Sequence, residues 1–293
     1  MTNLQTIRSF LLVDSALLAA EALAPDATGT RPGWLLPVYD EAAVSVSPLV
    51  IDIQAAYDCG ELAAMMIMLN AARPQVHVSL IDTSLSHPGL VQHMRRFIMI
   101  RTDDGRALTL RFADCLGLPV LAATFSAEQW SAFASPIKRW CVHGRNGALC
   151  DLPLADRQKT PALTPLVLTG RQLEALAEAT APDEMIADIR EMRHNVGMRG
   201  SSLEQHKWAS EARQLWRSAG NVDKLVLRWL TAAAVDTRGA VFDQRQIPSL
   251  LALHDTAAIR VGLDDAATQA KASLQCEPRQ PIPSTKQTYG EYP

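Results

Sequence analysis

The fold is decided by the stretch Phe97-Ile-Met-Ile-Arg-Thr-Asp-Asp-Gly-Arg-Ala-Leu-Thr-Leu-Arg-Phe112. Two runs typical of β-strands flank Asp104-Gly105, a dipeptide that favours a type I′ hairpin turn because both of its residues tolerate φ > 0. A turn at these two residues predicts one apolar face, made of the pairs Phe97–Phe112, Met99–Leu110 and Arg101–Leu108. A slip of one residue would exchange the two faces, so turn and pattern support each other. The hairpin contains no catalytic device, and we interpret it as scaffold.

The sequence around this hairpin mixes strands and short helices without a regular βαβ repeat, which predicts an α+β domain. Expected strands and hairpins cover Phe10–Asp14, Trp34–Tyr39, Leu49–Ile53, Val76–Ile81 and the pair Arg139–His143 with Ala148–Leu152. Expected helices cover Ser15–Leu23, a segment after the capping residue Asp58 with Leu62, Met65, Met66 and Leu69 buried, Leu90–Arg96, and a helix opened by the capping box Ser126–Gln129. The segment Asp114–Ala123 is expected to be a helix or a turn.

The second half of the chain loses nearly all strand signals and predicts an all-α lobe. Helix starts are expected at the capping boxes Thr169–Gln172 and Ser202–Gln205, at Asn221, and near Ile247-Pro248. The expected organisation is an α+β domain at 1–152, a proline-containing linker at 153–166, a helical lobe at 167–274 and a flexible tail at 275–293.

Composition indicates a soluble globular protein, because 48% of the 293 residues are hydrophobic and 20% are charged. The formal net charge of −3 disfavours nucleic acid as a partner. Basic residues nevertheless outnumber acidic ones between Met94 and Thr160. This excess has two readings: solvated faces that attract each other within one domain, or a basic patch for an acidic protein partner.

The five cysteines are odd in number and form no C-x-x-C motif. No run approaches the roughly 20 apolar residues that a membrane span needs, and the N-terminus does not read as a signal peptide. The sequence therefore predicts a cytoplasmic protein with reduced thiols and no membrane partner. Cys141 and Cys150 would face each other if Arg145-Asn146 were the turn between them, and would not if Asn146-Gly147 were.

The sequence contains none of the compact motifs of phosphate loops, dinucleotide-binding loops, nucleophile elbows or zinc-binding helices. The seven histidines are scattered without the spacing of metal ligands. We therefore expect no enzyme, no cofactor and no metal. A site assembled from distant residues stays open, because catalytic triads are recognised in space.

Four short segments resemble the type VI secretion adaptor-chaperone family, long catalogued as a domain of unknown function. They are Phe10-Leu-Leu-Val-Asp-Ser-Ala-Leu17, Ser84-Leu-Ser-His-Pro-Gly-Leu-Val-Gln-His-Met-Arg-Arg-Phe97, Asp104-Gly-Arg-Ala-Leu-Thr-Leu-Arg-Phe-Ala-Asp114 and Ser135-Pro-Ile-Lys-Arg-Trp140. The resemblance covers roughly the first half of the chain. One departure stands out, because Cys115-Leu116 occupies the place where the family usually has Pro-Arg.

The resemblance implies a non-enzymatic adaptor that binds a secretion effector and helps to load it onto the valine-glycine-repeat (VgrG) spike or its PAAR tip. We expect the α+β domain, or the cleft between lobes, to cover an apolar effector segment. Basic residues would steer an acidic partner and set its register. The candidate partner-binding residues are His93, Arg95, Arg96, Arg101, Arg111 and Asp114. Three of them have a structural alternative: Arg111 and Asp114 could form an ion pair at the end of the hairpin, and His93 could have a structural role.

Two other function classes remain open from sequence alone. One is a small enzyme, such as a hydrolase, whose site would combine Asp14, Asp82, His87 and Asp114. The other is an immunity protein that neutralises a toxin by binding its active domain.

Overall fold

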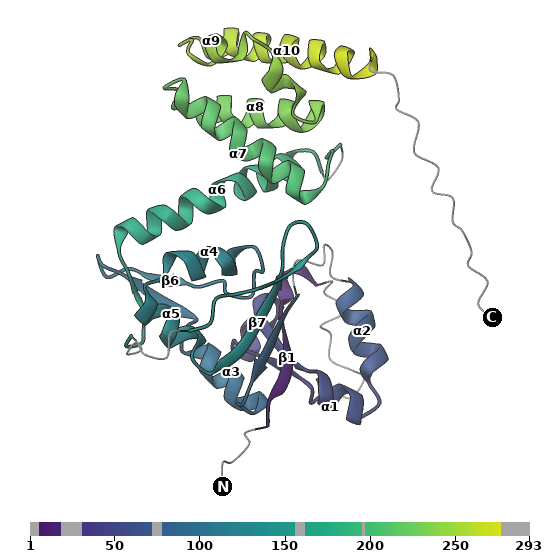
Figure 1. The fold of residues 1–293 in the computed structure, drawn as a ribbon, viewed down its shortest axis with the longest axis vertical. Coiled ribbons are helices and arrows are strands. Elements are labelled where there is room, and N and C mark those ends of the chain that lie inside the picture. The colour runs from purple at the N-terminus through teal and green to yellow at the C-terminus, as the bar shows by residue number, and fades with distance from the viewer. Residues whose placement is uncertain (1–5, 19–30, 72–77, 156–161, 195–196, 277–293) are drawn as a thin grey trace, which may run out of the picture. The chain divides into compact units, whose positions relative to one another are not determined.

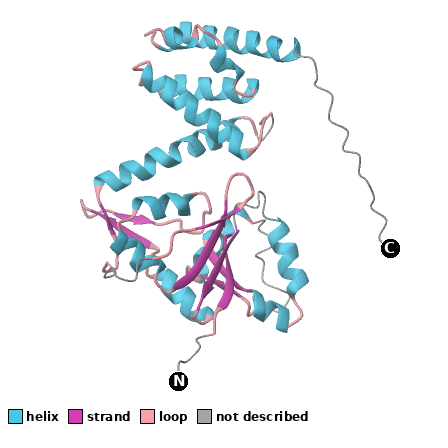
Figure 2. Cartoon of the chain, viewed as in Figure 1, coloured by secondary structure: helices cyan, strands magenta, loops and turns pink. Residues whose placement is uncertain are grey.

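The computed structural model describes residues 6–18, 31–71, 78–155, 162–194 and 197–276. Contacts divide the chain into two compact units, Met1–Ala181 and Pro182–Pro293. Within the described ranges, strands occur in the first unit, and the second unit is helical (Figure 2). The predicted fold class, an α+β domain followed by a helical lobe, is confirmed. None of the described helices combines the length and the apolar character that crossing a membrane requires.

The described strands are β1 (Arg8–Asp14), β2 (Leu35–Pro37), β3 (Pro48–Asp52), β4 (Val78–Thr83), β5 (Met99–Thr102), β6 (Ala107–Thr109), β7 (Ile137–His143), β8 (Leu149–Asp151) and β9 (Val167–Leu168). The α-helices are α1 (Ile53–Asp58), α2 (Leu62–Ala71), α3 (His87–Arg95), α4 (Gly117–Thr124), α5 (Ala127–Ala134), α6 (Gly170–Met192), α7 (Ser202–Ser218), α8 (Lys224–Thr237), α9 (Ile247–Leu251) and α10 (Thr256–Cys276). Short 3-10 turns are η1 (Ser15–Leu17), η3 (Glu41–Val46) and η5 (Ala240–Asp243).

The first unit is built on a six-stranded antiparallel sheet in the order β2-β3-β1-β4-β7-β8. Side chains alternate between its faces, so Phe10 and Leu12 of β1 enter one core and Val13 enters another. The first core includes residues of α3, α4 and α5, and the second includes residues of α2. These helices therefore cover opposite faces of the sheet (Figure 1).

The predicted Asp104-Gly105 hairpin forms, but its register differs by one residue from the prediction. Met99 lies opposite Thr109, and Arg101 lies opposite Ala107. Gly105 has φ +85°, whereas Asp104 is not in the left-handed region. The loop therefore spans three residues and ends on a single left-handed glycine instead of being a type I′ turn. Met99 is exposed and Ile100 is buried, the reverse of the prediction for β5, whereas Phe97, Leu110 and Phe112 of the predicted apolar face are buried.

The hairpin between β7 and β8 has the same kind of loop, with Gly147 at φ +77°. Cys141 lies opposite Asp151, and Cys150 lies opposite Val142. The observed pairing of the two strands therefore differs by one residue from each of the two pairings considered from sequence, and it lies between them. Both cysteines are free, and the Cys141 thiol donates to Asp151 Oδ1 over 2.6 Å.

Several helix starts follow local sequence rules. The capping box Ser126–Gln129 is confirmed at α5, and Thr169 and Gln172 make the same reciprocal hydrogen bonds at α6. Asp58 does not cap a helix as predicted, because it ends α1, which Asp52 caps. The helix predicted at Ser15–Leu23 begins as a 3-10 turn, which ends at Leu17. Its residues from 19 onward lie outside the described residues.

The segment expected as a linker at 153–166 is described at 153–155 and 162–166, and both pieces contain residues that pack on the first unit. Leu166 is buried in its core, and the next two residues pair as β9 with β5 in parallel. Trp130 Nε1 donates to the Pro153 carbonyl oxygen over 3.0 Å. The boundary between the two units lies in the sequence between Ala181 and Pro182, inside α6. It lies beyond the expected linker because apolar side chains before and after that linker belong to the core of the first unit.

The second unit packs α7, α8, α9 and α10 around one apolar core. Its first capping box is Ser201–Glu204, one residue before the predicted pair, and Asp223 rather than Asn221 caps α8. The helix predicted near Ile247 is two helices, and the second of them, α10, runs to Cys276. The expected tail at 275–293 therefore begins inside a helix, and 277–293 lie outside the described residues.

Trp208 of α7 lies directly against two glycines of the second unit. A Cβ atom at Gly200 would stand 2.5 Å from its ring, and a Cβ atom at Gly239 would stand 2.7 Å from its Nε1. Both glycines also have positive φ, +77° and +87°. Space and backbone conformation therefore both demand glycine at these positions.

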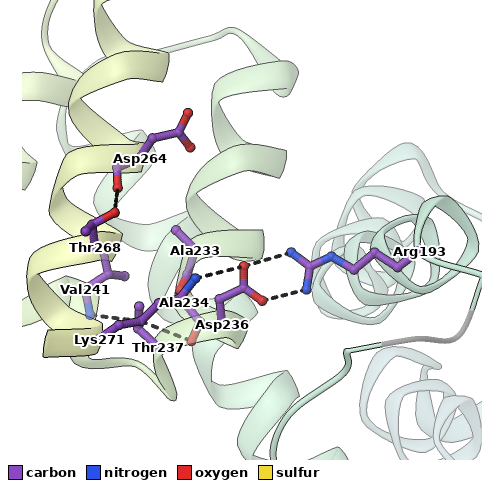
Figure 3. Close-up of polar contacts among 9 residues, drawn as sticks. All are labelled: Arg193, Ala233, Ala234, Asp236, Thr237, Val241, Asp264, Thr268 and Lys271. Atoms are coloured by element: carbon purple, nitrogen blue, oxygen red, sulfur yellow. Dashed lines mark hydrogen bonds and ion pairs between the residues drawn. The ribbon is translucent and has the colours of Figure 1, made fainter. Parts of the chain in front are cut away.

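An ion-pair cluster joins three segments of the second unit (Figure 3). Arg193, just after α6, donates from its two terminal nitrogens to the Asp236 carboxylate of α8 over 2.8 and 3.2 Å. Lys271 Nζ of α10 lies 3.8 Å from the same carboxylate. The two-pronged geometry fixes the end of α6 against α8.

Candidate partner-binding surfaces

Two of the predicted partner-binding residues hold α3 in place. His93 Nε2 donates to the Phe133 carbonyl oxygen over 2.7 Å, and burial lowers the pKa of its imidazole. Arg95 Nε donates to the Val38 carbonyl oxygen over 2.8 Å. These contacts connect α3 to the end of α5 and to the residue after β2. These contacts fit the structural role that was considered for His93 as an alternative.

Arg96 and Arg101 are exposed, and neither side chain has a carboxylate partner in the ranges that the structure describes. The guanidinium of Arg96 lies 5.7 Å from the centre of the Phe97 ring. Arg101 projects from β5 on the exposed face of the small sheet. Arg95 also lacks a carboxylate partner among the described residues, but Arg96 and Arg101 differ from it in making no side-chain hydrogen bond there.

Arg111 does not pair with Asp114, the partner expected from sequence. Its guanidinium instead lies 2.8 Å from Asp14 Oδ2 at the end of β1. This hydrogen bond raises the pKa of Arg111, and the charge of Asp114 acts in the same direction. Asp114 Oδ1 accepts the backbone N–H of Leu116 over 2.9 Å and so supports the turn into α4.

The departure from the family pattern at Cys115-Leu116 lies at this turn. Cys115 is only 1% exposed, and burial raises the pKa of its thiol to about 12. Leu116 is half-buried and precedes α4. Relative to the Pro-Arg that the resemblance leads us to expect, the difference at 115 lies in the core and the difference at 116 lies at a partly exposed position.

The residues considered for a hydrolase site do not form one group. Asp82 lies opposite Ser9 and accepts its hydroxyl over 2.6 Å. Asp14 lies five residues further along β1, at about 3.4 Å per residue. His87 is buried and donates from Nε2 to the Val50 carbonyl oxygen over 2.9 Å. Among the described residues, no group of three His, Cys, Asp or Glu side chains could hold a metal ion.

Helix α2 presents an exposed apolar face that sequence reasoning missed. We name this face, formed by Leu62, Ala63, Met66 and Ile67, the α2 surface. Leu62 and Met66 were predicted to be buried, but their exposed fractions are 36% and 47%, and that of Ile67 is 72%. The four residues lie on one side of the helix because they are spaced by one, four and five positions.

The opposite side of α2 is also apolar. Met65 and Met68 are buried against the sheet, and Trp34 Nε1 donates to Glu61 Oε2 over 2.6 Å just before the helix. No charged residue occurs between Leu62 and Ala71. A helix that is apolar all round is typical of a fully buried helix. The missing polar face was the sequence signal that the exposed side of α2 would be apolar.

A comparison with protein families matches part of the first unit. Residues 9–132 match the family described as "Domain of unknown function (DUF4123)". The matched segment runs from β1 into α5, so it contains the α2 surface and all six predicted residues. Neither the curated proteins nor the solved structures include a match to the chain.

Proposed function

We propose that this protein is a cytoplasmic, non-enzymatic adaptor-chaperone that holds a type VI secretion effector and helps to load it onto the VgrG spike or its PAAR tip. The observation that carries the proposal is the α2 surface, an uncharged helix face left exposed while the opposite side of the helix is buried. The resemblance of the motifs around residues 10–140, and the domain match over residues 9–132, support the family context.

The α2 surface suits an apolar cargo segment that would aggregate if left in water. Burying a side chain such as Ile67 or Met66 contributes about 1.5–3 kcal/mol each. Methionine is unbranched and polarisable, so it adapts to partners of different shape. The free charges of Arg96 and Arg101 steer an acidic partner toward the same unit and affect association rate more than affinity.

The proposal is tested with Ile67→Asp, because Ile67 is the most exposed large residue of the α2 surface. The matched control is Val261→Asp, a 61% exposed β-branched residue inside α10 of the second unit. Each full-length variant is co-expressed with effectors encoded beside its gene, and co-purified effector and secreted effector are quantified. We expect Ile67→Asp to weaken capture at least about tenfold, with Val261→Asp unchanged.

Equal capture by both variants and the wild type would contradict the role of the α2 surface. Absence of any effector or spike protein in the wild-type purification while secretion is active would contradict the adaptor function itself. The arginines are tested separately with the pair Arg96→Glu and Arg101→Glu. Arg95 is unsuitable for that test, because its hydrogen bond to the Val38 carbonyl would be lost with the charge.

A further inference from the structure

The small sheet of the first unit ends in a strand whose outer side has no neighbouring strand among the described residues. Its order is β6-β5-β9, so β6 is an edge. All three residues of β6, Ala107–Thr109, are exposed. An exposed edge strand offers main-chain groups to another strand.

The hydrogen-bond pattern shows which groups of β6 face outward. Leu110 N donates to the Ile98 carbonyl, and Thr102 N donates to the Arg106 carbonyl, over 2.8 and 2.9 Å. Hydrogen-bonded pairs recur every second residue in an antiparallel ladder. Leu108 therefore faces β5 with its main-chain groups, and those of Ala107 and Thr109 point to the open side. The described residues supply no partner for these outward groups.

Two cross-strand pairs lie on the exposed face of the small sheet beside this edge. Arg101 lies opposite Ala107, and Met99 lies opposite Thr109. Ala107 is small, so the Arg101 side chain can extend over β6 toward the open side. Among the described residues the Arg101 guanidinium has no hydrogen bond or ion pair.

The carboxylates of the hairpin loop are engaged elsewhere. Asp103 Oδ2 accepts the backbone N–H of Gly170 over 3.0 Å, and Asp104 Oδ2 pairs with Arg106 over 2.8 Å. Arg111, beyond the other end of β6, is occupied by Asp14. Beside the open edge, Arg101 is therefore the ionised side chain without a hydrogen bond or ion pair among the described residues, and its guanidinium can accept the carboxylate of an acidic residue as a partner.

We propose that β6 binds an extended segment of a partner protein as an additional antiparallel strand, with an acidic residue opposite Ala107 and an apolar residue opposite Thr109. The outward N–H and C=O groups of these two residues would hydrogen-bond the partner backbone. Strands lie about 4.8 Å apart, so the new strand lies about 10 Å from β5. An arginine and a glutamate side chain together span that distance across Ala107. The apolar side chain would contact Met99.

The proposal goes beyond the adaptor function, because it defines the backbone form and charge of a bound segment and does not depend on the α2 surface. The probes are two blocked peptides, Thr-Val-Thr-Glu-Thr and Thr-Val-Thr-Lys-Thr, titrated into the full chain labelled with nitrogen-15. We expect the glutamate peptide to shift the amide signals of Ala107 and Thr109 and to bind about fivefold more tightly than the lysine peptide.

Arg101→Glu is expected to reverse the order of the two peptides, and its amide spectrum away from β5 and β6 verifies that the variant folds. Thr109→Pro removes an outward donor without removing a bond to β5, and should weaken both peptides. Absence of binding, equal binding of both peptides, or shifts confined to other elements would overturn the proposal. Ile67→Asp should bind the glutamate peptide as the wild type does, so failure of effector capture and failure of strand binding are separable.

Discussion

Asp14 and Arg111 form an ion pair across 97 positions of the chain, with Asp14 Oδ2 2.8 Å from an Arg111 terminal nitrogen. The Asp14 side chain is 7% exposed, whereas that of Arg111 is 67% exposed. Asp14 Oδ1 also accepts the backbone N–H of Ala16 over 3.1 Å. The pair thus joins the end of β1 to the segment after β6, and the buried carboxylate depends on a largely exposed cation.

Replacing Arg111 should destabilise the first unit, because the buried Asp14 carboxyl group would lose its ion-pair partner. We expect Arg111→Ala to lower the free energy of unfolding by about 1–3 kcal/mol, measured by urea unfolding. Adding Asp14→Asn should recover part of the loss, so the two changes are not additive. Arg139→Ala, at the exposed pair with Asp151, should cost much less. Equal losses for both arginines would contradict this account.

The cysteines should divide into two reactivity classes. Cys115 and Cys141 are each 1% exposed, and burial is the main reason that their thiol pKa values rise to about 12 and about 11. Cys59 and Cys150 are exposed. In a Cys276→Ser background at pH 8, we expect two thiols to react quickly with a disulfide reagent and all four to react after denaturation. Fast reaction of a third thiol in the folded protein would contradict the structure.

Two histidines, the buried His87 and the partly buried His93, should make the first unit sensitive to mild acid. Burial lowers the pKa values of His87 and His93 below the ordinary value of 6.5. The unfolded chain therefore binds protons first as the pH falls below about 6.5, and the folded state loses up to about 1.4 kcal/mol per histidine per pH unit until the folded pKa is reached.

We expect His93→Gln to lose less stability than the wild type between pH 7.5 and 5.5, measured as the melting temperature at each pH. Glutamine can still donate to the Phe133 carbonyl oxygen. His254→Gln, at an exposed histidine, is the control and should follow the wild type. Parallel pH curves for wild type and His93→Gln would show that another group governs the acid sensitivity.

Local sequence patterns located both hairpins but not their registers. Asp104-Gly105 and Asn146-Gly147 each supply one left-handed glycine, and that is compatible with either a two-residue or a three-residue loop. In the structure Asn146 Oδ1 accepts the backbone N–H of Ala148 over 3.0 Å. This bond across the glycine supports the longer loop, and sequence alone does not reveal it. The same ambiguity affected the serines before α7, since Ser201–Glu204 and Ser202–Gln205 have equal spacing.

The candidate surfaces were harder to predict, because they depend on contacts distant in sequence. The partner of Arg111 is 97 positions away, and the Val38 carbonyl that binds Arg95 is 57 positions away. An uncharged helix such as α2 offers no contrast between apolar and polar faces, so periodicity could not tell Met65 from Met66. Only the packing of the sheet against one side decides which methionine is buried.

The packing of Trp208 against Gly200 and Gly239 should couple amino-acid substitutions at these three positions. A smaller residue at 208 would open space beside Gly200 and Gly239, but both backbones would remain left-handed. Asparagine, the side chain that best tolerates this conformation apart from glycine, is then the natural replacement. Among descendants of this sequence, loss of the tryptophan should therefore precede loss of either glycine, because the packing of the indole ring determines the order of substitution.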